Sequence, residues 1–134
     1  MALNPHVSTV SRDLGLDAAF DVLNGGGFLR VYDGTQPTNA DTALSSQVKL
    51  VELPLSSTAF SAASAGVKTA NAITSANAIA SSTATWATLV KSDGTTRVLD
   101  MSVGTTGADL NFNSVAISSG ALIVVSSLLI SQAA

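Results

Sequence analysis

Residues able to do acid–base or metal chemistry are few in this 134-residue chain, and they lie far apart. The chain has nine Asp and Glu residues, a single histidine, His6, and no cysteine. His6 has no second ligand or acid near it in the sequence, so we expect its side chain to face solvent. Asp17 and Asp21 stand four residues apart, where two carboxylates on one helix face repel mildly. A glycosidase pair would instead need burial and two matched environments, and the absence of cysteine excludes disulfides and thiolate metal sites.

The sequence DLNFNS places Asp109, Asn111 and Asn113 at the spacing of the first three oxygen ligands of a calcium loop. The loop glycine and the closing glutamate are absent, because position twelve would be Gly120. We therefore expect a turn in which these side chains bond the backbone. The many serines include no GxSxG motif. The sequence predicts a protein that is not an enzyme, with no catalytic residue, no metal and no cofactor.

The composition indicates a chain that works with partners. Charged residues make up only 11% of the sequence, against a usual share of about 25%. A monomer with so few charges would be poorly soluble, so we expect partners to cover much of its surface. The few Lys and Arg residues are scattered, which disfavours a nucleic-acid partner. The most apolar stretch, residues 121–130, is about half the length of a membrane-spanning helix, so we expect a buried strand and no membrane partner.

One helix is expected, over residues 13–23. It carries an apolar stripe at helical spacing, formed by Leu16, Ala19, Phe20 and Leu23. Asp13 or Asp17 should cap its N-terminus, and the glycines at 25–27 should stop it. Residues 1–12 are interpreted as an extended arm, because Pro5 forbids a helix across them.

Strand patterns begin at Phe28. The alternation in FLRVYDG predicts a strand, and VKLVELPL predicts another at a sheet edge, because Pro54 cannot donate to a ladder. Asp93-Gly94 predicts a two-residue hairpin turn with positive φ at both positions, in a register that puts Trp86 opposite Met101. Both faces of this hairpin are partly apolar, so we expect cover on both sides. Residues 121–130 should close the chain as a long central strand.

These elements predict a mainly β fold: an antiparallel β-sandwich with one short N-terminal helix and an extended N-terminal arm. We divide the chain into the arm and short helix, residues 1–27, and the sandwich domain, residues 28–134. The near-duplicate phrases ANAITS and ANAIAS at residues 70–81 could form a strand and its return, or a loop. We interpret them as a low-complexity duplication on a flat surface of small residues, because a β-helix would need many more coils.

Three stretches then carry a resemblance: YDGTQP at 32–37, the Trp86 strand leading into KSDGT at 91–95, and SVGTTGADLNFNS at 102–114. In these the chain resembles a family of small structural proteins encoded in tailed-bacteriophage genomes, over most of its length from Phe28 onward. The resemblance implies a virion component, and among these a capsid decoration or cement protein on the surface of the phage head, made in the host cytoplasm. It implies the major capsid protein as a partner and a homotrimer at three-fold positions of the shell. It assigns no functional residue.

We expect the arm to be ordered on a neighbouring subunit, because it has no periodic apolar face of its own to bury. The interface residues that this predicts are Met1, Asn4, Pro5, His6, Val7 and Arg12. Two other classes stay open: another virion part, such as a head fibre, connector or tail protein, and a carbohydrate-binding β-sandwich module. The sugar platform would be an exposed Trp86, Tyr32 or Phe28, so burial of Trp86 would remove its best candidate.

Overall fold

The computed structural model describes residues 8–125 and 128–131. The fold is mainly β with one short helix at its N-terminal side, which confirms the predicted class at that level. The helical elements are α1 (Thr9–Phe20) and the 3-10 turn η1 (Asp21–Leu23). The strands are β1 (Phe28–Tyr32), β2 (Lys49–Pro54), β3 (Val67–Thr69), β4 (Ala76–Asn77), β5 (Ser82–Thr83), β6 (Trp86–Val90), β7 (Arg97–Gly104), β8 (Leu110–Asn111), β9 (Ala116–Ile117), β10 (Leu122–Ile123) and β11 (Leu129–Ser131).

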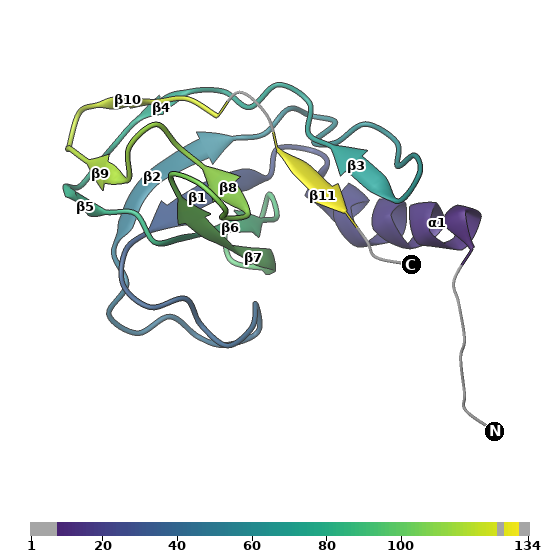
Figure 1. The fold of residues 1–134 in the computed structure, drawn as a ribbon, viewed down its shortest axis with the longest axis horizontal. Helices are drawn as coiled ribbons and strands as arrows, with labels where there is room; N and C mark the ends of the chain where they lie inside the picture. The colour runs from purple at the N-terminus through teal and green to yellow at the C-terminus, as the bar shows by residue number, and fades with distance from the viewer. Residues whose placement is uncertain (1–7, 126–127, 132–134) are drawn as a thin grey trace.

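Among the described residues, the largest sheet has the strand order β2-β1-β6-β7-β8 and curls into half a barrel (Figure 1). Its first four strands are antiparallel, and β2 lies at an edge, as Pro54 predicts. The other edge differs from the expected all-antiparallel pattern, because β8 runs parallel to β7, with Val103 opposite Leu110. The remaining strands form the short antiparallel pairs β10–β4, β11–β3 and β5–β9.

The helix begins earlier than predicted, and the expected arm is shorter by the same amount. Ser8 is the N-cap, and its Oγ accepts a hydrogen bond from the Ser11 amide at 3.2 Å. Neither Asp13 nor Asp17 caps the helix, because each carboxylate accepts a hydrogen bond from a backbone amide of residues 61–66 instead. Thr9 to Arg12 therefore belong to α1.

The inward face of α1 follows the expected stripe with one correction. Leu16, Phe20 and then Leu23 of η1 are buried in the same hydrophobic core as the strands. Ala19 is exposed, because the helix turns that flank toward solvent. The helical segment ends where the glycines predict, and Gly25 has a φ of +91°, which glycine adopts at low cost.

Both faces of β6 are covered, as the hairpin pattern predicts. Ala87 and Leu89 face the main core, whereas Trp86, Thr88 and Val90 lie on the opposite face and are also buried. The cover on that second face includes the long loop between β1 and β2, whose contacts with the sheet are described below.

The predicted hairpin register is wrong by one residue. Val90 pairs with Arg97, but Leu89 pairs with Leu99, so Val98 is an extra residue in β7 and Trp86 pairs with Ser102 rather than with Met101. The turn is also wider than predicted. Gly94 has a φ of +75°, but the residue before it keeps a negative φ, so the expected two-residue turn does not form.

The C-terminal apolar run is not one long central strand. It is divided into β10 and β11, which pair with the short strands β4 and β3 rather than entering the large sheet. The two copies of the repeated phrase also lie in different surroundings: Ile73 packs against the core, whereas Ile79 of the second copy is exposed. The repeat is therefore not a structural repeat.

Candidate functional site and interaction surfaces

The most concentrated chemistry in the described structure surrounds Lys68 on β3. Its side chain is 1% exposed, and its Nζ lies 2.6 Å from Asp17 Oδ1 and 3.1 Å from Asp21 Oδ1. Nζ also donates a hydrogen bond to the Ser61 carbonyl at 3.1 Å. Asp17 accepts a further hydrogen bond from the Ala63 amide. This group, which we name the Lys68 cluster (Lys68, Asp17 and Asp21), ties α1 and η1 to β3.

The interactions within the Lys68 cluster favour the charged forms of Lys68 and Asp17. Burial alone would lower the pKa of Lys68, but its hydrogen bonds with Asp17 and Asp21 outweigh burial and raise it. The hydrogen bond from Lys68 lowers the pKa of Asp17. A protonated lysine has no lone pair to use as a nucleophile or in a Schiff base. The cluster therefore acts as a structural ion pair in the state that the structure describes.

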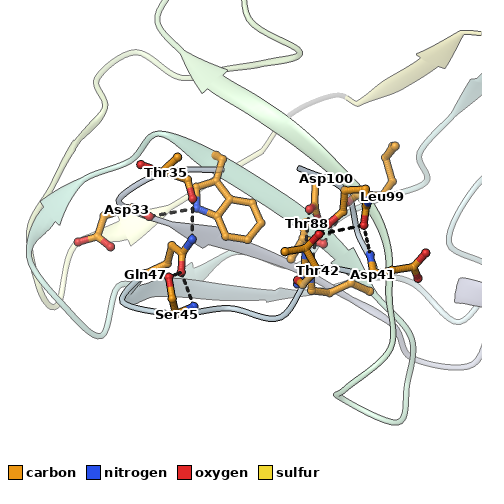
Figure 2. Close-up of polar contacts among 12 residues, drawn as sticks. Asp33, Thr35, Asp41, Thr42, Ser45, Gln47, Thr88, Leu99 and Asp100 are labelled. Atoms are coloured by element: carbon orange, nitrogen blue, oxygen red, sulfur yellow. Dashed lines mark hydrogen bonds and ion pairs between the residues drawn. The ribbon is translucent and has the colours of Figure 1, made fainter. Parts of the chain in front are cut away.

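A second polar group straps the loop between β1 and β2 onto the outer face of the sheet (Figure 2). Trp86 Nε1 donates to the Asp33 carbonyl at 3.0 Å, and Gln47 Nε2 donates to the Thr35 carbonyl at 2.6 Å. Farther along the loop, Arg97 donates to the carbonyls of Asn39 and Thr42. Arg97 also pairs with Asp100 at 2.6 Å.

Trp86 and Arg97 use their hydrogen-bond donors to hold the loop. Trp86 is fully buried and stacks on Tyr32, with ring centroids 4.7 Å apart. The guanidinium of Arg97 lies 5.6 Å from the centre of the Trp86 ring, so the cation also contributes to this packing. A sugar cannot stack on a buried indole, which removes the best platform for a carbohydrate-binding site.

The acidic side chains at the turns bond the backbone. Asp93 accepts hydrogen bonds from the amides of Thr95 and Thr96 and from the Thr96 hydroxyl. The hydroxyl bond is the largest of the effects that lower the Asp93 pKa. This carboxylate holds the wide turn between β6 and β7.

The stretch that resembles part of a calcium loop behaves as a turn. Asp109 Oδ2 accepts from the Ser102 amide at 3.0 Å, and Asn111 Oδ1 accepts from the Ala108 amide at 3.1 Å. The expectation that these side chains bond the backbone is confirmed at Asp109 and Asn111. Across residues 8–125 and 128–131, no group of three or more His, Cys, Asp or Glu side chains is placed to hold a metal ion.

Two shallow hollows accompany the small strand pairs in the described region. One, of about 210 Å³, lies between β7 and β11 and includes Asp100 and Asp109. Both carboxylates are already bonded, to Arg97 and to Ser102 respectively. The other, of about 270 Å³, is lined mainly by apolar residues of 112–124. Neither hollow gathers uncommitted acid, base and nucleophile side chains.

The predicted interface residues are only partly placed. Met1, Asn4, Pro5, His6 and Val7 lie outside the described residues. Arg12 lies within α1 rather than in an arm, and its Nη2 donates to Thr9 Oγ1 at 3.1 Å.

Sequence reasoning missed a different set of surface residues. Large apolar side chains are exposed in the described structure at Val10, Leu14, Val22, Leu44, Val48, Ile79, Leu122, Val124 and Leu129. On α1 a signal was present in the four-residue spacing of Val10 and Leu14. It was missed because the helix was expected to start after Val10. Lys68 was likewise missed, since its acidic partners are distant in sequence.

Comparisons with family models, with curated proteins and with solved structures found no match to this chain. In the described part of the chain, no helix has the length and hydropathy needed to cross a lipid bilayer.

Proposed function

We propose that this chain is a non-enzymatic structural protein of a tailed-phage virion, a decoration protein that binds the major capsid protein on the outside of the head as a homotrimer. The observation that carries the proposal is a contrast between the polar and the large apolar side chains in the described residues. Most of the prominent polar side chains make their bonds within the chain. They belong to the Lys68 cluster, to the contacts of Trp86 and Arg97 with the β1–β2 loop, and to the turns. Large apolar side chains are exposed instead.

This contrast suits a protein whose role is to be held between partners. Internal ion pairs and a loop held against the sheet make the folded chain rigid. Covering exposed apolar side chains with another surface lowers the free energy of the complex. A specific interface would bury on the order of 1,200 Å² in total. The sandwich arrangement of the sheets, the location on the phage head and synthesis in the host cytoplasm belong to the same proposal. Burial of Trp86 argues against the carbohydrate-binding alternative.

The test is co-sedimentation of the purified chain with tailed-phage heads from which accessory proteins have been removed. We expect saturable binding that stops at a fixed number of copies per head. Binding to tails or connectors but not to heads would move the chain to another part of the virion. An absence of binding to any virion part would overturn the proposal.

A test of the arm's role in binding requires a shorter deletion than the sequence suggested. Removing residues 1–12 would also remove the first turn of α1, which begins at Thr9. Deletion of residues 1–7 leaves the Ser8 cap in place. We expect this variant to unfold at the same temperature as the native chain but to bind heads more weakly. Unchanged head binding would show that the arm is not part of the interface.

A further inference from the structure

The loop between β1 and β2 is long and has no secondary structure of its own. It runs from residue 33 to residue 48 without a helix or a strand. Loops of more than about 12–15 residues with no regular structure are uncommon in compact domains, and they are usually lids, binding loops or linkers. This loop is bonded to the sheet by Trp86 and Arg97, so it has the character of a lid rather than of a linker.

Burial differs sharply between the loop and the sheet side chains against which it lies. None of residues 34–46 is buried. On the sheet, Trp86 is fully buried and Tyr32 is 5% exposed, and the side chains of Arg97 and Asp100 are 9% and 4% exposed. Segments with few buried apolar contacts open at the lowest free-energy cost. The loop can therefore leave the sheet without exposing apolar side chains of its own.

The two ends of the loop are bonded to each other and form a closed neck. The Asp33 amide donates to the Val48 carbonyl at 3.2 Å, and the Val48 amide donates to Asp33 Oδ1 at 2.6 Å. Gln47 donates to the Thr35 carbonyl one step farther out. None of these bonds involves residues 36–46, which we name the loop tip. The tip can therefore move about the neck while β1 and β2 keep their places.

One side chain, Arg97, makes the hydrogen bonds that join the loop tip to the sheet within the described residues. Its guanidinium donates to the carbonyls of Asn39 and Thr42. Those two residues form a turn of their own, in which the Thr42 amide donates to the Asn39 carbonyl at 3.1 Å. Asn39 Oδ1 also accepts from the Asp41 amide at 2.9 Å. The tip therefore meets Arg97 as a preformed turn that does not depend on the sheet for its shape.

Arg97 is itself held in place by the sheet. Its Nη2 lies 2.6 Å from Asp100 Oδ2, and its Nε donates to Asp100 Oδ1 at 3.3 Å. The guanidinium also lies 5.6 Å from the centre of the Trp86 ring. Figure 2 shows Thr42 close to Asp100, at the end of the loop away from Thr35. These sheet partners remain when the tip moves away, so Arg97 is the fixed side of the contact and the tip is the moving side.

We propose that the loop tip is a hinged lid, held closed by Arg97, and that its opening uncovers Trp86 and Tyr32 while the sheet stays folded. In the closed state the loop is part of the rigid body described above. In the open state the outer face of the sheet exchanges a polar surface for an aromatic one. The inference concerns the chain by itself and does not depend on a virion role.

The first experiment removes the lid by replacing residues 37–45 with Gly-Gly. Such a short link can close the loop, because the two sides of the neck are adjacent: a Cβ on Gly34 would lie 3.7 Å from the Gln47 Cα. We expect this variant to keep its β-sheet circular dichroism and a cooperative unfolding transition, since none of the removed residues is buried. Acrylamide should quench the fluorescence of Trp86, the only tryptophan, about twofold or more as strongly as in the native chain.

The second experiment measures how often the lid opens, by thermolysin digestion of the native fold. When opening and closing are faster than cleavage, the cleavage rate follows the population of the open form. Arg97→Lys keeps a positive charge facing Asp100 but loses the planar fork that also reaches the loop carbonyls. The control is Arg30→Lys, because Arg30 pairs with Glu52 on the same sheet and has no hydrogen bond to the loop. Thermal unfolding of each variant checks that it is folded, and fragment masses locate the cleavage.

We expect Arg97→Lys to speed cleavage within the loop tip about fivefold, the effect of one lost hydrogen bond, and Arg30→Lys to change it less than about twofold. Cleavage of the native chain should respond little to low urea, because opening of the tip exposes little surface. Cleavage that rises with urea in step with global unfolding would overturn the inference, as would equal rates for the two lysine variants. A lid-deleted chain that is unfolded, or whose Trp86 stays as protected as in the native chain, would also overturn it. A failure to bind phage heads would leave these results unaffected.

Discussion

Truncation of Lys68 to alanine should destabilise the fold mainly through lost packing. The side chain is enclosed, so Lys68→Ala removes three buried methylenes at roughly 1 kcal/mol each. Loss of the ion pairs should add only about 1 kcal/mol, because Asp17 and Asp21 have side chains 31% and 52% exposed and would stay hydrated. We expect a total loss of about 3–4 kcal/mol. Lys68→Met retains most of the stem and should cost only about 1 kcal/mol.

The assay is urea unfolding followed by the fluorescence of Trp86, which is the only tryptophan in the chain. The protein should be dilute, so that self-association does not add to the measured free energy. Lys91→Ala, at the turn between β6 and β7, is the control and should stay within about 0.5 kcal/mol of the native chain. Equal losses for the methionine and alanine variants would refute the packing argument and assign the whole effect to charge. A native-like Lys68→Ala would refute the burial of the side chain.

Three further predictions concern pH and glycine. Lys68 holds the pKa of Asp17 below its ordinary value of 3.8, so stability from this carboxylate should be present above about pH 4 and lost as the pH falls through the folded-state value. The raised pKa of Lys68, above 10.5, makes its contribution disappear only as the pH rises through that higher value, and Lys68→Met should flatten both ends of a pH–stability curve. Gly27→Ala should cost about 1–3 kcal/mol in urea unfolding, because its Cβ would lie 2.8 Å from the Val90 carbonyl oxygen; a native-like variant would show that the backbone relaxes there. Gly94→Val should cost at least about 1 kcal/mol, because its φ is +75°, and an unchanged unfolding midpoint would contradict that strain.

Local patterns predicted the elements whose causes are local. Burial in β1 alternates from Phe28 to Val31, and the glycines after η1 stop the helical segment where expected. The hairpin was also foreseen, but its register was not. Asp93 captures the amides of Thr95 and Thr96, which widens the turn, and Val98 becomes the extra residue. A one-residue difference of this kind depends on side-chain bonds that alternation does not encode.

The missed features depend on partners far along the chain. Periodicity grouped Lys68 with small residues on one strand face, but its burial is possible only because Asp17 and Asp21 approach from the helix. The apolar run at 121–130 was read as a strand buried on both faces. Its available partners, β3 and β4, are themselves too short to pair with a long strand. In both cases tertiary context overrode the local pattern.

The position of β3 has a consequence for the order of folding. This short strand is joined to α1 by the Lys68 cluster and pairs with β11 along its length. Residues from both ends of the described chain therefore depend on β3 for their place in the fold. Contacts this distant in sequence form late and slowly. During synthesis, α1 would leave the ribosome long before β11 could complete the pairing. A segment of 12 residues is too short to hold a stable helix alone, so α1 should become a lasting helix only after β3 has formed and Lys68 can bind its carboxylates.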